Sequence, residues 1–268
     1  PTAVAPANAT VDLTANGITG YNDPETYIAN KSDLPTVGTT PDTKTTYTWK
    51  SGENPTVSNG QLTRTVVVTY PDGSSDDVPV TFTVRDTVAP TITNLIPIRN
   101  AEIDRTNPRK IIVYREEEFS VDVNLTDNSG RLNKVKVDDR TTTTIESRDP
   151  FEMRPQARIV DTAKGTEISF TNTSNNLGQD GNATDANPYK VTISGHVGKN
   201  QQVNNDASRN SWTRYISGYD QSNLTNNNNV SNATNNANIQ IEFRKQSDKY
   251  TPTATNPTVK VTSNGTVP

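Results

Sequence analysis

The feature that most restricts the fold of this chain is a pair of β-branched runs on either side of a tight-turn signal. Residues 65–84 read TVVVTYPDGSSDDVPVTFTV, with Pro-Asp-Gly between the two runs. Runs of Val, Thr and Phe separated by a short loop with Pro, Asp and Gly favour an antiparallel β-hairpin. We therefore expect two paired strands here, with the turn between Tyr70 and Ser75.

The composition extends this expectation to the whole chain. Only 30% of the 268 residues are hydrophobic and 6% are aromatic, so the core is expected to be thin, between sheets that each have one solvent-facing side. The polar residues are mostly Thr, Asn, Asp and Ser, which favour turns and strand surfaces over helix interiors. A helical bundle is excluded. We expect an all-β chain of tandem immunoglobulin-like β-sandwich modules in an elongated rod.

The net charge and the cysteine content restrict the binding partners and the cellular compartment that the sequence suits. The formal net charge is -4 and no block of Lys or Arg occurs, so the chain is not expected to bind nucleic acid. No apolar run is long enough to insert into a membrane. The chain has no cysteine, which excludes disulfides and thiolate metal sites. The abrupt start at Pro1 is typical of an internal fragment of a longer protein.

The hairpin and the segments before it resemble a known module. Tyr47-Thr48-Trp49 has a strand pattern, and Pro24 suits the start of one short helical turn. The matching residues are Ile18, Asp23-Pro24, Ile28-Ala29-Asn30, Leu34-Pro35 and Thr46 to Trp49, followed by Thr65 to Ser74 and Val78-Pro79-Val80. Over about residues 10–87 they resemble the Rib/alpha-like module of Gram-positive surface proteins. The resemblance implies an immunoglobulin-like β domain that usually repeats in the stalk of a wall-anchored protein, although only one copy occurs here.

A second module is predicted to begin after this hairpin. Residues 85–92 read RDTVAPTI, and Pro90 cannot continue the preceding strand ladder. The segment resembles the D-T-x-A-P-T junction that opens many bacterial immunoglobulin-like and cadherin-like repeats. Two later segments, TDNSG at 126–130 and GYDQSN at 218–223, resemble loops of the same repeats. We expect residues 88–268 to form one enlarged immunoglobulin-like or cadherin-like β-sandwich, with two merged modules as the alternative.

Alternating apolar residues predict the buried faces of this second module. Period-two alternation places every second side chain on one face of a strand. The residues expected to face the core are Phe119, Val121, Val123, Leu125, Ile239, Ile241 and Phe243. Residues 172–187 and 223–238 are rich in Asn, and we expect long surface loops or a mobile hairpin tip there, either inert or used for binding.

The sequence offers little for catalysis. His196 is the only histidine, and no G-x-S-x-G motif accompanies it. Zinc is disfavoured by the single histidine and the missing cysteines. Paired carboxylates of the glycosidase kind stay open, because their separation cannot be read from a sequence. We expect no enzymatic activity and a structural or surface role for His196.

Calcium is the ion that the composition favours, because Ca²⁺ binds six to eight oxygen ligands. The predicted ligands are Asp86 in the linker, Asp127 and Asn128 in the loop after a strand, and Asp220 in a late hairpin. These three segments gather at one end of an immunoglobulin-like sandwich. We therefore expect the carboxylates to converge on a Ca²⁺ ion that stiffens the junction between the modules.

Two further acidic segments are weaker candidates for the same chemistry. Residues 180–185 read DGNATD, and Glu102 lies close to Asp104. Asp and Asn also cap ordinary turns through their own backbones, and a plain turn is the favoured interpretation at both places.

Two functions stay open after this reasoning. The first is a structural stalk or presentation segment of a bacterial cell-wall-anchored adhesin or biofilm-associated protein, in contact with neighbouring modules outside the cell. The alternative is that the larger domain itself binds a host matrix protein or glycan, through its Asn-rich loops or by stacking a sugar on Trp212, Tyr215 or Tyr219. Trp212 and Tyr215 are an odd number of positions apart, so on a strand their side chains should point to opposite faces, and we expect one of them in the core. A wall-associated hydrolase fragment is a more remote third possibility.

Overall fold

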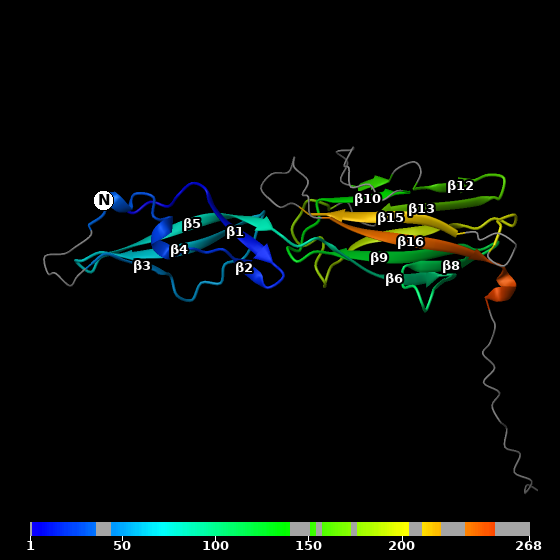
Figure 1. Cartoon of the computed structure of the whole chain (residues 1–268), viewed down its shortest axis with the longest axis horizontal. Coiled ribbons are helices and arrows are strands. Elements are labelled where there is room, and N and C mark those ends of the chain that lie inside the picture. The colour runs from blue at the N-terminus through cyan, green and yellow to red at the C-terminus, as the bar shows by residue number, and fades with distance from the viewer. Residues whose placement is uncertain are drawn as a thin grey trace, which may run out of the picture.

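The computed structural model describes residues 2–35, 44–139, 151–153, 157–172, 176–203, 211–220 and 234–249. These residues form β-strands and short 3-10 helices, in a smaller unit followed by a larger unit along an elongated chain (Figure 1). The all-β fold expected from the sequence is confirmed. None of the helices within these ranges is long and apolar enough to cross a membrane.

The smaller unit is built on one five-stranded sheet in the order β2-β1-β5-β4-β3. β1 runs parallel to β5, and the other neighbours are antiparallel. Two 3-10 helices, η1 and η2, lie between β2 and β3, and Pro24 begins η1 as expected. The elements are β1 (Ala9–Thr14), β2 (Gly17–Thr19), η1 (Pro24–Tyr27), η2 (Lys31–Asp33), β3 (Thr46–Trp49), β4 (Gln61–Thr69) and β5 (Ser75–Asp86).

The predicted hairpin is formed by β4 and β5. Their ladder closes with Thr69 opposite Ser75. In the turn, the Asp72 Oδ1 atom accepts a hydrogen bond from the Ser74 N–H at 2.9 Å, and Gly73 has a φ of 86°, a value that glycine adopts without the steric cost of a side chain. The turn residues therefore fix the register of the hairpin.

The core of the smaller unit lies on one face of its sheet. Val66, Val68 and Val80 are fully buried, as their alternation predicts. Tyr27 packs its ring against Phe82 with 4.9 Å between the ring centroids. Trp49 is half-buried and packs against the same cluster. The η1 segment thus closes a core that a single sheet could not close alone.

The larger unit is a sandwich of two sheets. One sheet has the strand order β11-β10-β15-β16-β8-β7 and the other β12-β13-β14-β9-β6. The strands of the first are β7 (Ala101–Ile103), β8 (Lys110–Tyr114), β10 (Lys134–Asp138), β11 (Phe151–Met153), β15 (Ser211–Tyr219) and β16 (Thr234–Arg244). The strands of the second are β6 (Thr91–Arg99), β9 (Glu118–Thr126), β12 (Ile159–Asp161), β13 (Thr166–Asn172) and β14 (Tyr189–His196). A third 3-10 helix, η3 (Gln246–Asp248), follows β16.

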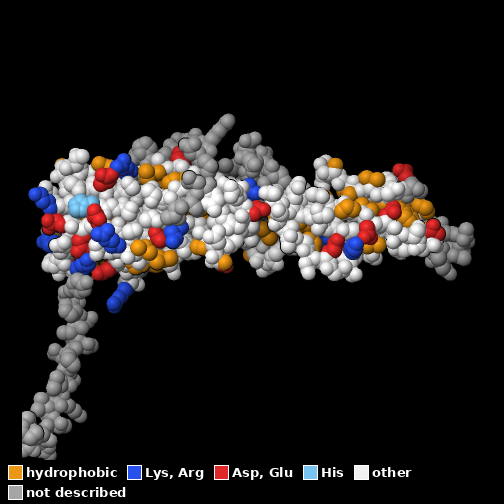
Figure 2. Space-filling model, turned by 180° about the vertical axis from the view of Figure 1, so that it is seen from behind, with side chains coloured by type: hydrophobic (Ala, Val, Ile, Leu, Met, Phe, Trp, Pro, Cys, Tyr) orange, Lys and Arg blue, Asp and Glu red, His pale blue; other side chains and the backbone are white. Residues whose placement is uncertain are grey.

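One apolar core fills the space between these two sheets. The residues predicted from alternation are all inside it: Phe119, Val121, Val123, Leu125, Ile239, Ile241 and Phe243 are at most 2% exposed. Trp212 on β15 is half-buried and packs against this core. Charged side chains of both signs gather at the end of the larger unit that lies away from the smaller one (Figure 2).

One loop expectation is wrong in part. Residues 234–238, at the end of the second Asn-rich stretch, belong to β16 and pair with β15, where Thr234 lies opposite Tyr219 and Asn238 opposite Tyr215. Asn has a low strand propensity, but strand propensity is set largely by packing and pairing with neighbours. Here a complete ladder along β15 overrides the local preference. Residues 221–233 lie outside the described ranges.

Candidate functional site

Three aspartates meet where the smaller unit joins the larger one. Asp86 is the last residue of β5, Asp127 follows β9 and Asp220 follows β15. One carboxylate oxygen of each lies within 4.8 Å of the corresponding oxygens of the other two. Their exposed fractions are 2%, 9% and 0%. The structure therefore brings together, in a buried position, the three carboxylates that the sequence placed at this junction.

The hydrogen bonds of two of these carboxylates leave one oxygen of each available. Asp86 Oδ1 accepts the Val88 N–H at 3.0 Å. Asp127 Oδ2 accepts the Ser129 N–H at 2.9 Å and also the Ser129 hydroxyl. Asp86 Oδ2 and Asp127 Oδ1 are buried, and no described residue donates a hydrogen bond to either.

The electrostatics of this cluster are unfavourable as it stands. The pKa of the Asp127 carboxyl is raised to about 7, chiefly by burial and also by the negative charge of Asp86, against the lowering effect of the Ser129 hydrogen bonds. A carboxylate that leaves water without a compensating positive charge is costly. The junction therefore holds acidic groups in an arrangement that a cation would stabilise.

An unexpected element holds the Asp127 loop in place. Asn182 comes from the first Asn-rich stretch and is 3% exposed. Its Oδ1 accepts the Leu132 N–H at 2.8 Å, and its Nδ2 donates to the Leu132 carbonyl at 2.9 Å and to the Asn176 carbonyl at 2.6 Å. The Asp127 N–H donates to the Ala183 carbonyl at 2.8 Å. The described part of this stretch is therefore packed against the acidic loop.

The other predicted cation ligands contact protein groups. Asn128 is exposed, and its Nδ2 atom lies 3.4 Å from the Thr14 carbonyl of the smaller unit; its role as a ligand stays a prediction. Asp180 Oδ2 accepts the Asn59 N–H at 2.7 Å, again across the junction. Residues of the larger unit thus reach two loops of the smaller unit by direct polar contacts.

The pair Glu102 and Asp104 has the turn geometry that was favoured for it. Asp104 Oδ1 accepts the N–H groups of Thr106 and Asn107 at 2.8 and 2.9 Å, and Lys110 Nζ lies 2.9 Å from Asp104 Oδ2. The hydrogen bonds from Thr106 and Lys110 lower the pKa of Asp104. This carboxylate already has a full set of donors and a cation.

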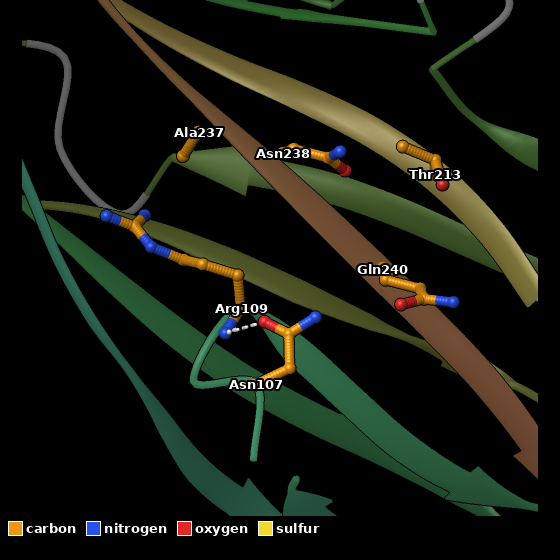
Figure 3. Close-up of a pocket in the computed structure, with 6 residues that line it drawn as sticks. All are labelled: Asn107, Arg109, Thr213, Ala237, Asn238 and Gln240. Atoms are coloured by element: carbon orange, nitrogen blue, oxygen red, sulfur yellow. Dashed lines mark hydrogen bonds between the residues drawn. The ribbon is translucent and has the colours of Figure 1, made fainter.

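A polar hollow of about 460 Å³ lies on the first sheet of the larger unit, over β16 and the start of β8 (Figure 3). It is lined by Asn107, Arg109, Thr213, Ala237, Asn238 and Gln240. Arg109 Nη2 donates to the Ile92 carbonyl at 2.6 Å. Arg109 Nη1 is buried and has no hydrogen-bond partner among the described residues, and burial lowers the pKa of this guanidinium.

The strand beside the hollow carries an aromatic ring and a second guanidinium. Arg214 lies over the Trp212 ring, 5.3 Å from its centroid, and its Nε donates to the Ala157 carbonyl at 3.1 Å. The pairing of β10 with β15 ends at Tyr215, so residues 211–214 extend beyond β10. Tyr219, one of the three aromatic residues considered for sugar stacking, is fully buried and cannot contact a ligand.

His196 lies at the end of β14 and is exposed. Its neighbours across the sheet are Glu118 on β9 and Glu167 on β13. This is a surface position between two acidic residues, consistent with the expected surface role.

Comparisons with known proteins place this chain in an adhesin family. A family model for the Rib domain matches residues 5–86, and one for the GspA/SrpA SigLec-like domain matches residues 100–240, more than half of the chain. The chain belongs to the GspA/SrpA SigLec-like domain family. The Rib module expected from the sequence is also confirmed.

Relatives of the chain are streptococcal adhesins. It is 27% identical over 166 residues to the streptococcal hemagglutinin of Streptococcus gordonii, covering 59% of this chain and 6% of that protein. It is similar to the SrpA adhesin of Streptococcus sanguinis, with 28% identity, a TM-score of 0.37 and 62% of each chain covered. The sialic acid binding region of the Streptococcus sanguinis SK1 adhesin, solved with 3'sLn, shares 23% identity, with a TM-score of 0.40 and coverage of 91% of this chain and 47% of that one. The chain thus spans only part of each relative.

Proposed function

We propose that the larger unit binds a sialylated host glycan and that the Rib module is a spacer that presents it at the bacterial surface. The observation that carries this proposal is a polar hollow in a SigLec-like domain, lined by the guanidinium-bearing Arg109 together with hydroxyl and amide side chains. A guanidinium binds a carboxylate through charge-assisted hydrogen bonds. Sialic acid is a sugar that carries a carboxylate.

The rest of the hollow suits the neutral part of such a sugar. Thr213, Asn107 and Gln240 line the hollow and supply hydroxyl and amide groups that can pair with sugar hydroxyls. Figure 3 labels the lining residues. Small-molecule sites combine a concave surface with a few fixed polar groups that orient the ligand.

The location and role of the whole protein are part of the proposal. We place the parent protein outside the cell, anchored to the wall, with the Rib module as one segment of its stalk. A host matrix protein is the alternative ligand. It would need a larger surface than this hollow, because protein interfaces bury about 800 Å² on each partner.

Binding of a sialylated trisaccharide and of its desialylated counterpart to the intact chain tests this function. We expect binding of the sialylated form only. A hydrogen bond to a charged group contributes about 1.5–3 kcal/mol. Arg109→Gln removes the charge that would bind the sugar carboxylate, so it should weaken binding roughly 10- to 100-fold. Thr213→Val, which removes one hydroxyl, should weaken it less. Arg99→Gln is the matched control, because Arg99 is exposed and pairs with Glu118 on the surface.

The outcome for Arg214 decides where the sugar lies. If Arg214→Gln abolished binding while Arg109→Gln left it unchanged, the ligand would sit at the edge of β15 along residues 211–214, and the hollow would be the wrong site. A folded chain that bound no sialylated glycan would contradict the function and leave both units as spacers.

A further inference from the structure

We infer that the junction between the Rib module and the SigLec-like unit is a calcium site, formed by Asp86, Asp127 and Asp220. This inference does not depend on the proposed glycan binding. It rests on the mutual distances of the three carboxylates, on their burial, and on the two oxygens that lack a hydrogen-bond donor.

The distances suit one shared ion. Calcium binds oxygen at about 2.3–2.6 Å, so two oxygens that bind the same ion are at most about 5 Å apart. The three carboxylate oxygens lie within 4.8 Å of one another. Each comes from a different segment, at the end of a strand, so the sheets themselves fix the geometry.

The burial of these groups points to a ligand rather than to an ordinary acidic patch. Acidic clusters on a surface are solvated and need no counter-ion. Asp86 and Asp127 are at least nine-tenths buried, and Asp86 Oδ2 and Asp127 Oδ1 have no donor among the described residues. Buried polar atoms are normally paired. A divalent cation would bind both oxygens and remove the repulsion between the charges.

The ligand atoms at this site favour one kind of metal ion. All three side chains offer carboxylate oxygens, which hard cations prefer, and neither sulfur nor imidazole is available at this place. Mg²⁺ requires a near-ideal octahedron at about 2.0–2.1 Å and keeps its waters, whereas Ca²⁺ accepts irregular oxygen shells. Three carboxylate oxygens at distances of up to 4.8 Å from one another therefore fit Ca²⁺ better, with water or backbone carbonyls as the remaining ligands.

The ion would join two modules. Asp86 belongs to the last strand of the Rib module, and it pairs in register with Leu13 on β1. Asp127 and Asp220 belong to the SigLec-like unit. Among the described residues, the polar contacts from Asp180 to Asn59 and from Asn128 to Thr14 cross the junction, and Asp180, Asn59 and Asn128 are exposed. A shared ion would add a strong link at the point where the chain crosses, and so limit bending between the two units.

Thermal unfolding of the intact chain in 10 mM CaCl₂, in 10 mM MgCl₂ and in EDTA tests the site. Extracellular calcium modules bind with a Kd of about 10⁻⁴–10⁻³ M, so this concentration exceeds the Kd by about 10- to 100-fold. We expect Ca²⁺ to raise the Tm by roughly 3–10 °C relative to EDTA, and Mg²⁺ to raise it less. Calorimetric titration should give one Ca²⁺ per chain.

Asp127→Asn is the decisive variant. It keeps an oxygen for the Ser129 N–H but removes one negative charge, so in EDTA it should melt at or above the temperature of the unaltered chain. Added Ca²⁺ should no longer raise its Tm. Asp86→Asn should behave in the same way, which guards against a folding defect peculiar to one position. Asp72→Asn is the control, because Asp72 only caps the β4–β5 turn.

Three results would overturn the inference. They are a Tm that is the same in Ca²⁺ and EDTA, an undiminished calcium shift in both Asp127→Asn and Asp86→Asn, or an equal shift with Mg²⁺ and Ca²⁺. None of these readouts involves a glycan, so the calcium site and the glycan site can fail independently.

Discussion

Replacing Asn182 by alanine tests how the acidic loop at the junction is held. The Asn182 side chain makes three hydrogen bonds from a buried position. The variant leaves the buried Leu132 N–H without an acceptor, which lowers the free energy of unfolding by about 1–3 kcal/mol. The Leu132 carbonyl keeps its bond from the Gly178 N–H at 2.7 Å, so losing the two bonds from Nδ2 costs only about 0.5–1.5 kcal/mol each. We expect a total loss of about 3 kcal/mol.

Urea unfolding followed by NMR separates the two units, because the chain has two tryptophans. The indole resonance of Trp49 reports on the Rib module and that of Trp212 on the SigLec-like unit. With an m-value of about 2–3 kcal/mol/M, Asn182→Ala should lower the midpoint reported by Trp212 by about 1 M and leave that of Trp49 unchanged. The same variant should bind Ca²⁺ more weakly, because Asp127 lies in the loop that Asn182 supports.

Asn187→Ala is the matched control for this experiment. Asn187 lies in the same stretch, is exposed, and donates one side-chain hydrogen bond to the Gly181 carbonyl at 2.8 Å. Its loss should cost less than about 1 kcal/mol. Equal midpoint shifts for Asn182→Ala and Asn187→Ala would refute the reasoning, since burial and the Leu132 N–H would then contribute nothing.

Three further predictions concern the separate modules and the surface histidine. Phe82→Ala should cost about 3–5 kcal/mol, because its ring packs against Tyr21 and Tyr27 in the Rib core; the Trp49 midpoint should fall and the Trp212 midpoint should not. A fragment of residues 2–87 should give the dispersed NMR spectrum of a folded domain, because its core is separate from that of the larger unit, and a collapsed amide spectrum would contradict this. His196→Gln should leave glycan binding within twofold, because His196 is exposed and is not among the residues that line the proposed hollow; a large loss in the folded variant would show that the hollow is not the binding surface.

The strands with clear alternation could be predicted from the sequence. Phe119 to Leu125 and Ile239 to Phe243 alternate with period two, and that pattern determines which face is buried whatever the neighbouring strand is. The Rib hairpin was predictable for a similar local reason, because Pro-Asp-Gly fixes the turn and the turn fixes the register.

The convergence of Asp86, Asp127 and Asp220 was also predictable, but by a different route. Their positions followed from the order of strands in an immunoglobulin-like sandwich, where the entering linker and two loops share one end. The sequence could not show that the carboxylates are buried, which depends on packing across the junction. Their occupancy by calcium stays a prediction.

The remaining functional residues gave no readable signal. Asn182 stands in an Asn-rich run that has the composition of a solvated loop, and only the tertiary contact with Leu132 distinguishes it from its neighbours. Arg109 has no surrounding motif, and the tertiary contact that holds its Nη2 against the Ile92 carbonyl gives no sequence signal. Arg214 likewise stands in no motif, and its position over the Trp212 ring is a tertiary feature.

The central claim is that the SigLec-like unit binds a sialylated glycan in the polar hollow over β16 and the start of β8. The most direct measurement is a titration of the intact chain with a sialylated trisaccharide, followed through the two tryptophan indole resonances. The account predicts that Trp212 shifts in a saturable way, that Trp49 does not move, and that the desialylated sugar shifts neither. A saturable shift of Trp49 alone, or the same shift of Trp212 with both sugars, would contradict it.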